Sequence, residues 1–338
     1  MVTLLQSEGD RDRARRLVEA CGLAFVEGTD ELVGIFEAGE LVATGARVGH
    51  ILQMLAIAPA HQGGALLGEL VGDLAQRARA AGLDQLFVFT RPEHAGSFGH
   101  LGFNLLASHG RAALLEHGEG LARWLNDRLG LVEPGDNGAV VVNCNPFTRG
   151  HRYLVEQAAA RVATLYVFVV SEDRSAFPYA ARRRLVEAGT RDLANVVVLD
   201  TGPYAVSAVT FPSYFLHDAG DRAAAQMGLD LVLFGRQLAP FFGVRTRFFG
   251  EEPFCATTRA YNQAMLRILP ACGVAAVELP RLAAGGVAIS ASAVREALRR
   301  GELSGLAALV PPSTLAWLQG DEGRAVRERL LAARGRHT

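Results

Sequence analysis

Five short apolar runs, separated by segments with helical periodicity, constrain the fold of this chain more than any other feature of its sequence. The runs lie at residues 139–142, 165–170, 196–199, 231–234 and 275–279. Strands buried on both faces read as continuous apolar runs, and their alternation with helices is typical of a parallel sheet covered on both sides. We therefore predict a doubly wound, Rossmann-like α/β fold for this part of the chain. In such folds ligands bind at the carboxyl ends of the strands.

The first part of the chain has a different pattern, which indicates a smaller α/β domain. Helices are predicted at residues 10–22 and 64–81. Strands are predicted at residues 33–36, 41–43, 51–57 and 86–90. A cluster of Pro, Gly, Asp and Asn at residues 134–138 marks the junction between the two patterns. We place the domains at residues 1–132 and 138–338, and we expect a helical end from Glu302 onward.

The composition excludes several classes of chemistry. Lysine is absent, so all 34 basic residues are arginines, and 35 acidic residues leave a net charge of −1. A P-loop lysine and a Schiff-base lysine are therefore excluded, and a nucleic-acid partner bound by bulk charge is not expected. The four cysteines are scattered without metal-ligand spacing, so we predict no metal site. We find no stretch of roughly 18 to 20 apolar residues and no signal peptide, and we expect a cytoplasmic protein without membrane contact.

The first motif with chemical potential follows the run at residues 139–142 and leads into a predicted helix. It reads Asn143-Cys144-Asn145-Pro146-Phe147-Thr148-Arg149-Gly150-His151. Gly150 is expected to let the backbone approach a ligand, and the free amides of a helix start attract an anion. A protonated His151 would there hydrogen-bond phosphate oxygens whose charge grows during phosphoryl transfer. The alternative is a histidine that only caps or packs the helix.

A second motif, Ile289-Ser290-Ala291-Ser292-Ala293-Val294-Arg295, also opens a predicted helix after a strand and a loop. Ser290 or Ser292 can cap this helix, and Ser292 and Arg295 share one helix face. Two hydroxyl groups, a positive helix end and a guanidinium group then converge on one predicted anion site. The alternative is a capped helix with a surface arginine.

Together the two motifs resemble those of the adenylyl-transferring nucleotidyltransferase superfamily, His-x-Gly-His and Ile-Ser-x-[Ser/Thr]-x-x-Arg, with Thr148 in place of the first histidine. The form of the first motif, Asn-Pro-Phe-Thr-x-Gly-His-Arg-Tyr-Leu, resembles the citrate lyase ligase family. Further blocks that resemble this family are Ser171-Glu172-Asp173-Arg174-Ser175-Ala176-Phe177-Pro178, Thr210-Phe211-Pro212-Ser213-Tyr214-Phe215, Phe249-Gly250-Glu251-Glu252-Pro253 and Tyr261-Asn262. The resemblance covers most of residues 139–300.

The resemblance implies roles for individual residues of this sequence. Contacts with the ATP phosphates would come from His151 and Thr148 in the first motif and, for the β and γ phosphates, from Ser290, Ser292 and Arg295 in the second. The nucleotide pocket would be shaped by Asn145, Phe147 and Gly150. Cys144 is interpreted as a small buried residue and not as a nucleophile.

Other candidate residues have two possible roles each. Arg174 stands where the family pattern has lysine, and its guanidinium group can bind phosphate instead. Arg236, after the predicted strand at residues 231–234, either contacts the nucleotide or serves as a surface ion-pair partner. Glu251 and Glu252 either hold Mg²⁺ or cap local structure.

The first domain resembles the acyl-CoA N-acyltransferase (GNAT) superfamily. The segment from Met54 to Leu67 leads through Pro59 to Gln62 as in that superfamily, although Ala65 and Leu67 replace two small residues of its pattern. Phe98-Gly99-His100-Leu101-Gly102-Phe103 matches a later block. The resemblance implies that this domain recognises a pantetheine arm or docks a carrier protein.

The family resemblance implies a ligase that uses ATP and Mg²⁺ to activate acetate as acetyl-adenylate. The acetyl group then passes to the phosphopantetheine-type thiol of the citrate lyase acyl carrier subunit, and AMP and pyrophosphate are released. One alternative is an adenylyltransferase that acts on a phosphomonoester such as pantetheine phosphate or nicotinamide mononucleotide. A second alternative is an inactive carrier-binding protein that retains the fold.

Overall fold

The computed structural model describes the whole chain except residues 174, 208, 210–218, 254, 285–286 and 333–338. By its contacts the chain divides into two compact units. The first unit contains Met1–Asn126 and Ala208–Leu233, and the second contains Asp127–Ser207 and Phe234–Thr338. None of the described helices is both long and apolar enough to span a bilayer.

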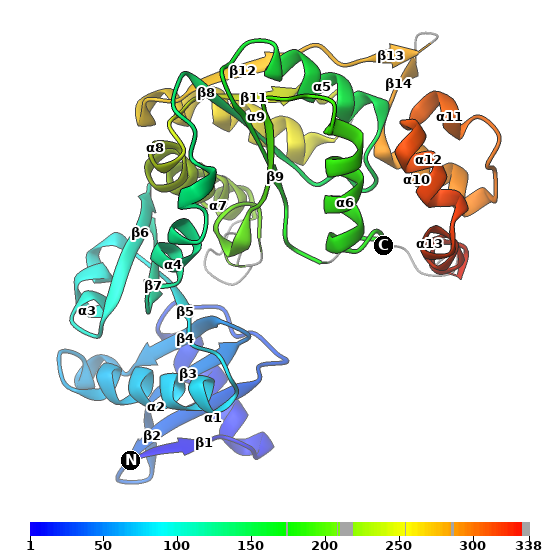
Figure 1. The fold of residues 1–338 in the computed structure, drawn as a ribbon. Coiled ribbons are helices and arrows are strands. Elements are labelled where there is room, and N and C mark those ends of the chain that lie inside the picture. The colour runs from blue at the N-terminus through cyan, green and yellow to red at the C-terminus, as the bar shows by residue number, and fades with distance from the viewer. Residues whose placement is uncertain (174, 208, 210–218, 254, 285–286, 333–338) are drawn as a thin grey trace. The chain divides into compact units, whose positions relative to one another are not determined.

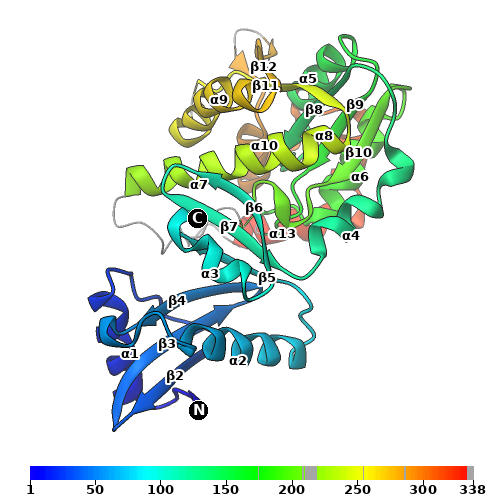
Figure 2. The same cartoon turned by 90° about the vertical axis from the view of Figure 1, so that its left-hand side faces the viewer.

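The first unit is built on a seven-stranded mixed sheet with the strand order β1-β2-β3-β4-β5-β7-β6. The strands are β1 (Val2–Leu4), β2 (Glu31–Glu37), β3 (Glu40–Val48), β4 (Ile51–Ile57), β5 (Leu86–Thr90), β6 (Phe103–His109) and β7 (Ala112–His117). Helix α1 (Glu8–Ala20) packs on one face through Ala14 and Val18, and α2 (Leu66–Ala80) packs on the other through Leu70 and Leu74 (Figure 2). The predicted helices and strands of this region are confirmed.

The described part of the first unit also contains the α-helices α3 (Ala95–Gly99), α4 (Gly120–Asn126) and α7 (Ala219–Leu233). The sequence places α7 in the second domain, but the helix packs on β6 and β7. Gly228 lets α7 approach His109 closely, because an added Cβ atom at this position would lie 2.0 Å from His109 Cδ2.

The second unit contains the predicted parallel sheet (Figure 1). Its strand order is β10-β9-β8-β11-β12 (Figure 2). Its strands are β8 (Asn137–Val142), β9 (Leu165–Val169), β10 (Val196–Asp200), β11 (Val244–Gly250) and β12 (Ala275–Leu279). Its longer helices are α5 (Arg149–Ala159), α6 (Tyr179–Thr190), α9 (Ala256–Ile268), α10 (Ala291–Arg300), α12 (Pro312–Gln319) and α13 (Asp321–Ala332). The doubly wound α/β fold and the helical end are confirmed. The strand order reverses between β8 and β11, which defines the switch point where such folds bind ligands.

One predicted strand of this unit is wrong. Residues 231–234 form the end of α7 and the start of a π-helical turn, Phe234–Leu238, and the fourth strand is β11 instead. A short apolar run does not distinguish a buried helix end from a buried strand. Strand β11 escapes a search for apolar runs because it carries Arg245 and Arg247. Arg247 is nevertheless buried, with its guanidinium group 4.4 Å from the centre of the Phe234 ring.

Candidate active site

Three segments carry the candidate residues to the carboxyl edge of the second sheet. Strand β8 ends at Val142 and leads through residues 143–148 into α5, while β11 ends at Gly250 and leads to Glu251 and Glu252. Strand β12 leads to Arg281 and then, through the hairpin of β13 (Ala283–Ala284) and β14 (Val287–Ala288), to Ser290 at the start of α10. Both sequence motifs therefore begin helices at the same edge of the sheet, at the switch point.

At the start of α5, Thr148 and His151 hold each other in a reciprocal capping arrangement. Thr148 Oγ1 accepts a hydrogen bond from the His151 backbone N–H at 3.3 Å. The Thr148 backbone N–H donates to His151 Nδ1 at 3.1 Å. Because Nδ1 accepts a hydrogen bond, the proton of the neutral ring lies on Nε2. Nδ1 of His151 therefore takes part in capping the helix, as the alternative predicts. Nε2–H can still donate a hydrogen bond to a ligand.

The structure corrects the expected charge of His151. Burial, followed by the positive charges of Arg281 and Arg295, lowers the pKa of this imidazole to about 4. The ring is therefore neutral near pH 7, and the prediction of a protonated imidazole is wrong for the free protein. A neutral Nε2–H group still donates a hydrogen bond to a phosphate oxygen.

Three residues expected at the nucleotide or phosphates have protein partners in the structure. Thr148 is 1% exposed, and its hydroxyl group lies 3.0 Å from His151 Nδ1. The buried Phe147 ring stacks on His151 with 6.0 Å between ring centres. A Cβ atom at Gly150 would lie 3.1 Å from the Ile289 carbonyl oxygen, so this glycine lets the second motif approach the first. The geometry gives these residues positioning roles around His151.

The second motif joins the first through Arg295. Ser290 caps α10 by accepting a hydrogen bond from the Ala293 backbone N–H at 3.0 Å. Arg295 Nη2 donates to Ser292 Oγ at 3.0 Å, and its Nη1 donates to the Asn145 carbonyl oxygen at 2.6 Å. Asn145 in turn accepts a hydrogen bond from the Phe177 backbone N–H through Oδ1. Arg295 is partly buried, and burial lowers its pKa, so the surface-arginine alternative does not fit.

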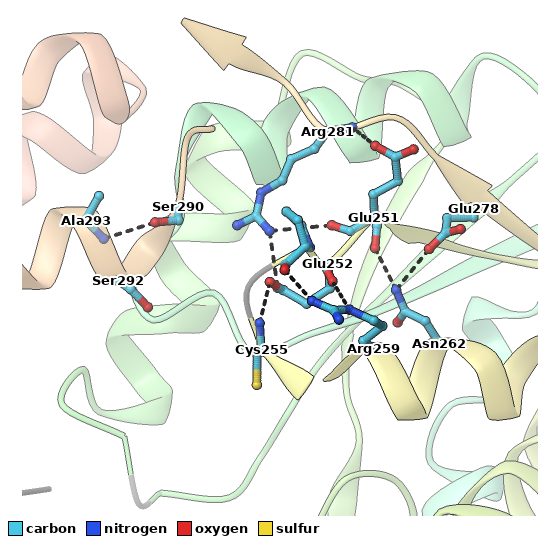
Figure 3. Close-up of polar contacts among 12 residues, drawn as sticks. Glu251, Glu252, Cys255, Arg259, Asn262, Glu278, Arg281, Ser290, Ser292 and Ala293 are labelled. Carbon is cyan, nitrogen blue, oxygen red and sulfur yellow. Dashed lines mark hydrogen bonds and ion pairs between the residues drawn. The ribbon is translucent and has the colours of Figure 1, made fainter. Parts of the chain in front are cut away.

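The two acidic residues after β11 have structural partners, as Figure 3 shows. Glu252 Oε1 accepts a hydrogen bond from the Cys255 backbone N–H at 3.1 Å, and Oε2 lies 3.2 Å from Arg281 Nη1. Glu251 Oε2 accepts from the Arg281 backbone N–H at 3.2 Å. Within the part of the chain that the structure describes, no group of three or more His, Cys, Asp or Glu residues is arranged to hold a metal ion. These contacts favour the capping role over the Mg²⁺ role.

The expected position of Arg236 is wrong, because no strand precedes it. The residue is exposed in the π-helical turn Phe234–Leu238. Its neighbour Gly235 packs on Cys272, where an added Cβ atom would lie 2.7 Å from Cys272 Cβ. Cys272 precedes β12, so this turn lies at the amino edge of the sheet, opposite to the motifs. The predicted nucleotide contact depended on a place at the carboxyl end of a strand, and Arg236 does not lie there.

Two other predicted residues have different outcomes. Arg174 and the block at residues 210–215 lie outside the described residues. Cys144 is buried with 1% exposure, and burial strongly raises the pKa of its thiol. This finding confirms the interpretation of Cys144 as a small buried residue.

Sequence reasoning misses two arginines that shape this edge. Arg182 in α6 is 0% exposed and donates hydrogen bonds to the carbonyl oxygens of Asn143, Val170, Glu172 and Phe177. It thereby fixes the chain where β8 and β9 end. The available signal is its place on the same apolar helix face as Leu185 and Val186. Arg281, the second arginine, acts on His151 from the hairpin side of the site.

The parallel sheet defines the second unit as a doubly wound α/β domain, with the polar side chains of both motifs at its switch point. Comparison with known proteins makes the assignment specific. The family model of the citrate lyase ligase C-terminal domain matches residues 137–318.

Similar proteins extend this match over nearly the whole chain. A citrate (pro-3S)-lyase ligase of Klebsiella pneumoniae is 40% identical over 325 residues, covering 94% of this chain and 95% of that protein. One of Escherichia coli (strain K12) is 38% identical over 288 residues, covering 83% of this chain and 82% of that protein. A solved acyl-CoA N-acyltransferase from Pseudomonas aeruginosa is 14% identical, covering 35% of this chain and 97% of its own, with a TM-score of 0.30. The chain belongs to the citrate (pro-3S)-lyase ligase family and is an enzyme.

Proposed function

We propose that this chain is an ATP-dependent, cytoplasmic ligase that acetylates the prosthetic-group thiol of the citrate lyase acyl carrier subunit through acetyl-adenylate. The observation that carries the proposal is the direct contact between the two motifs. Arg295 of the second motif donates to the Asn145 carbonyl of the first, and both Arg295 and Arg281 act on His151. The neutral His151 ring and the two arginines lie at the edge of the sheet where α5 and α10 begin, and this combination is suited to a polyphosphate.

In the first step, a carboxylate oxygen of acetate attacks the α-phosphorus of Mg-ATP. A bond forms between this oxygen and the α-phosphorus, while the bond to the β-phosphate breaks and pyrophosphate leaves. His151 Nε2–H would donate to an α-phosphate oxygen, and Ser290, Ser292 and Arg295 would hold the β and γ phosphates. The protein supplies no nucleophile in this step, in agreement with the burial and raised pKa of Cys144.

In the second step, the thiolate of the carrier's phosphopantetheine-type group attacks the carbonyl carbon of acetyl-adenylate. A thioester forms, and the bond between the carbonyl carbon and the AMP oxygen breaks. Mg²⁺ enters with ATP as part of the substrate, because phosphate oxygens and water can supply most of its ligands.

We place recognition of the pantetheine arm or of the carrier protein in the first unit. Strands β4 and β5 run parallel and pair in their first part, at Ile51↔Phe87 and Leu52↔Val88. Within the described residues, β4 continues to Ile57 and β5 to Thr90 beyond these paired positions. An extended arm with amide groups can hydrogen-bond to the backbone of a strand, as peptides do when they extend a sheet. The short pairing of β4 with β5 therefore supports recognition of a pantetheine arm by the first unit.

Exchange of labelled pyrophosphate into ATP tests the first step. With purified protein and Mg²⁺, we expect exchange that requires acetate and does not require the carrier subunit. The competing function is adenylyl transfer to a phosphomonoester. Exchange that is absent with acetate and appears with dephospho-coenzyme A or a nicotinamide dinucleotide would contradict the ligase mechanism and support that alternative.

A further inference from the structure

A small hairpin brings Arg281 to the start of α10. Its two strands pair through Ala283↔Ala288 and Ala284↔Val287. The pairing continues outward, because the Ile289 backbone N–H donates to the Leu282 carbonyl at 3.1 Å. One residue further along, Arg281 lies across the hairpin from Ser290, the N-cap of α10. The hairpin register thus places Arg281 opposite the first residue of the second motif's helix cap.

In the free protein, this guanidinium group forms an ion pair with the carboxylate of Glu252. Arg281 Nη1 lies 3.2 Å from Glu252 Oε2 and 3.4 Å from the Glu251 carbonyl oxygen. Figure 3 shows the side chain of Arg281 extending toward Glu252. Glu252 keeps a second contact, with the Cys255 backbone N–H, that does not involve the arginine. The carboxylate therefore stays anchored to the start of α9 whether or not Arg281 remains bound to it.

The electrostatic effect on His151 indicates that Arg281 faces the same site as His151 and Arg295. The positive charges of Arg281 and Arg295 both lower the pKa of this imidazole, so both guanidinium groups lie close enough to act on the ring. The ring is itself a ligand of the proposed polyphosphate site. Arg281 completes a set of donors that come from α5, from α10 and from the hairpin.

We infer that Arg281 is a further phosphate-binding residue of this site, and that Glu252 holds its guanidinium group until the triphosphate takes it over. The inference rests on the proposed function for the identity of ATP as the ligand. A triphosphate offers several negative oxygens to a planar guanidinium group, whereas the Glu252 carboxylate carries one charge and also binds the Cys255 backbone N–H. Glu252 is then a competitor of the substrate and not a ligand of Mg²⁺.

Binding of Mg-ATP, inorganic tripolyphosphate and AMP to the full chain by isothermal titration tests this inference. For Arg281→Gln we expect the Kd of Mg-ATP and of tripolyphosphate to rise about 10- to 100-fold, as is typical when a charged hydrogen bond is lost, with little change for AMP. Arg281→Lys, which keeps the charge, should restore part of the affinity. Arg259→Gln is the matched control, because Arg259 contacts the carbonyl oxygens of Glu252 and Pro253 in the same cluster.

The variant Glu252→Gln tests whether Glu252 competes with the triphosphate for Arg281 or only stabilises the fold through its ion pair with Arg281. The change removes the carboxylate charge but keeps an oxygen for the Cys255 backbone N–H, so we expect Mg-ATP to bind several-fold more tightly. If Arg281 only stabilises the fold through Glu252, both variants will bind Mg-ATP more weakly, and this result would overturn the inference. Unchanged binding by Arg281→Gln would overturn it as well. A wild-type protein that binds tripolyphosphate but not ATP would contradict the proposed function, while the tripolyphosphate series still tests Arg281.

Discussion

The helix starts of α5 and α10 face the same edge of the sheet but are built differently. At α5 the polar groups are used inside the protein, since Thr148 is buried and its hydroxyl and backbone N–H groups bind His151. At α10 the cap is Ser290, and Ser292 remains exposed with Arg295 as its partner. The first helix start fixes one donor rigidly, whereas the second offers several accessible groups.

This difference indicates a division of labour between the two motifs. A rigid donor with a defined proton position suits an oxygen whose charge changes during the reaction. Accessible hydroxyl and guanidinium groups suit the β and γ phosphates, which bind and leave. Changes at α5 should therefore alter kcat, and changes at α10 should alter the KM for ATP.

The largest effect is expected for His151→Ala. The loss of a preorganised donor to a developing negative charge lowers rates by about 10²- to 10³-fold. We expect such a loss in kcat for acetate-dependent pyrophosphate exchange, with a smaller change in the KM for ATP. A decrease of less than tenfold would show that the imidazole only packs against Phe147.

The neutral state of His151 also predicts a dependence of stability on pH. Its pKa is lowered to about 4 in the folded protein, from 6.5 for the ordinary side chain, so the unfolded chain binds more protons between these values. The stabilising contribution is therefore complete above pH 6.5 and is lost as the pH falls toward 4. The loss amounts to about 3 kcal/mol on the scale of 1.36 kcal/mol per pKa unit.

Denaturant unfolding of the wild type and of His151→Asn, measured between pH 7 and pH 4, checks this contribution. The wild type should lose more free energy of unfolding than the variant over this interval. Parallel curves for the two proteins would contradict a depressed pKa at this position.

Thr148→Val tests whether the cap of α5 positions the histidine. Loss of a side-chain cap costs about 0.5 to 2 kcal/mol of stability. We expect kcat to fall by roughly tenfold with an unchanged KM for ATP, because the ring keeps its bond from the Thr148 backbone N–H but loses the hydroxyl contact. Thr148→Ser should restore both stability and kcat. A rise in KM with unchanged kcat would instead indicate direct contact with the substrate phosphates.

Ser292→Ala is expected to have the smallest effect. Loss of one neutral hydrogen bond costs about 1 kcal/mol, which corresponds to roughly a fivefold rise in the KM for ATP. Because Ser292 does not cap α10 whereas Ser290 does, the thermal midpoint should stay unchanged for Ser292→Ala and fall for Ser290→Ala. Equal losses of stability would remove the distinction between the two serines.

Most of the fold is predictable from sequence because buried parallel strands have a strong apolar signature. The signature fails at β11, where Arg247 is buried by stacking on Phe234, and at residues 231–234, where a buried helix end imitates a strand. Both failures have one cause: local pattern does not show which neighbour covers a side chain.

The site was predictable in its motifs but not in the relations between them. The spacing of Thr148 and His151 indicates a helix start, but the proton position of the ring follows only from the observed bond to Nδ1. The contact of Arg295 with Asn145 crosses 150 residues of sequence. Arg281 depends on the register of a two-stranded hairpin, which no motif encodes.

The central claim is that both helix starts act on one transfer, in which an acetate oxygen attacks the α-phosphorus of ATP. The most direct test supplies acetate labelled with ¹⁸O in both oxygens, together with Mg-ATP and the thiol form of the carrier subunit, and locates the label by mass spectrometry. The account predicts one ¹⁸O atom in the phosphate of the released AMP and none in pyrophosphate. Unlabelled AMP, or label in pyrophosphate or orthophosphate, would contradict the account.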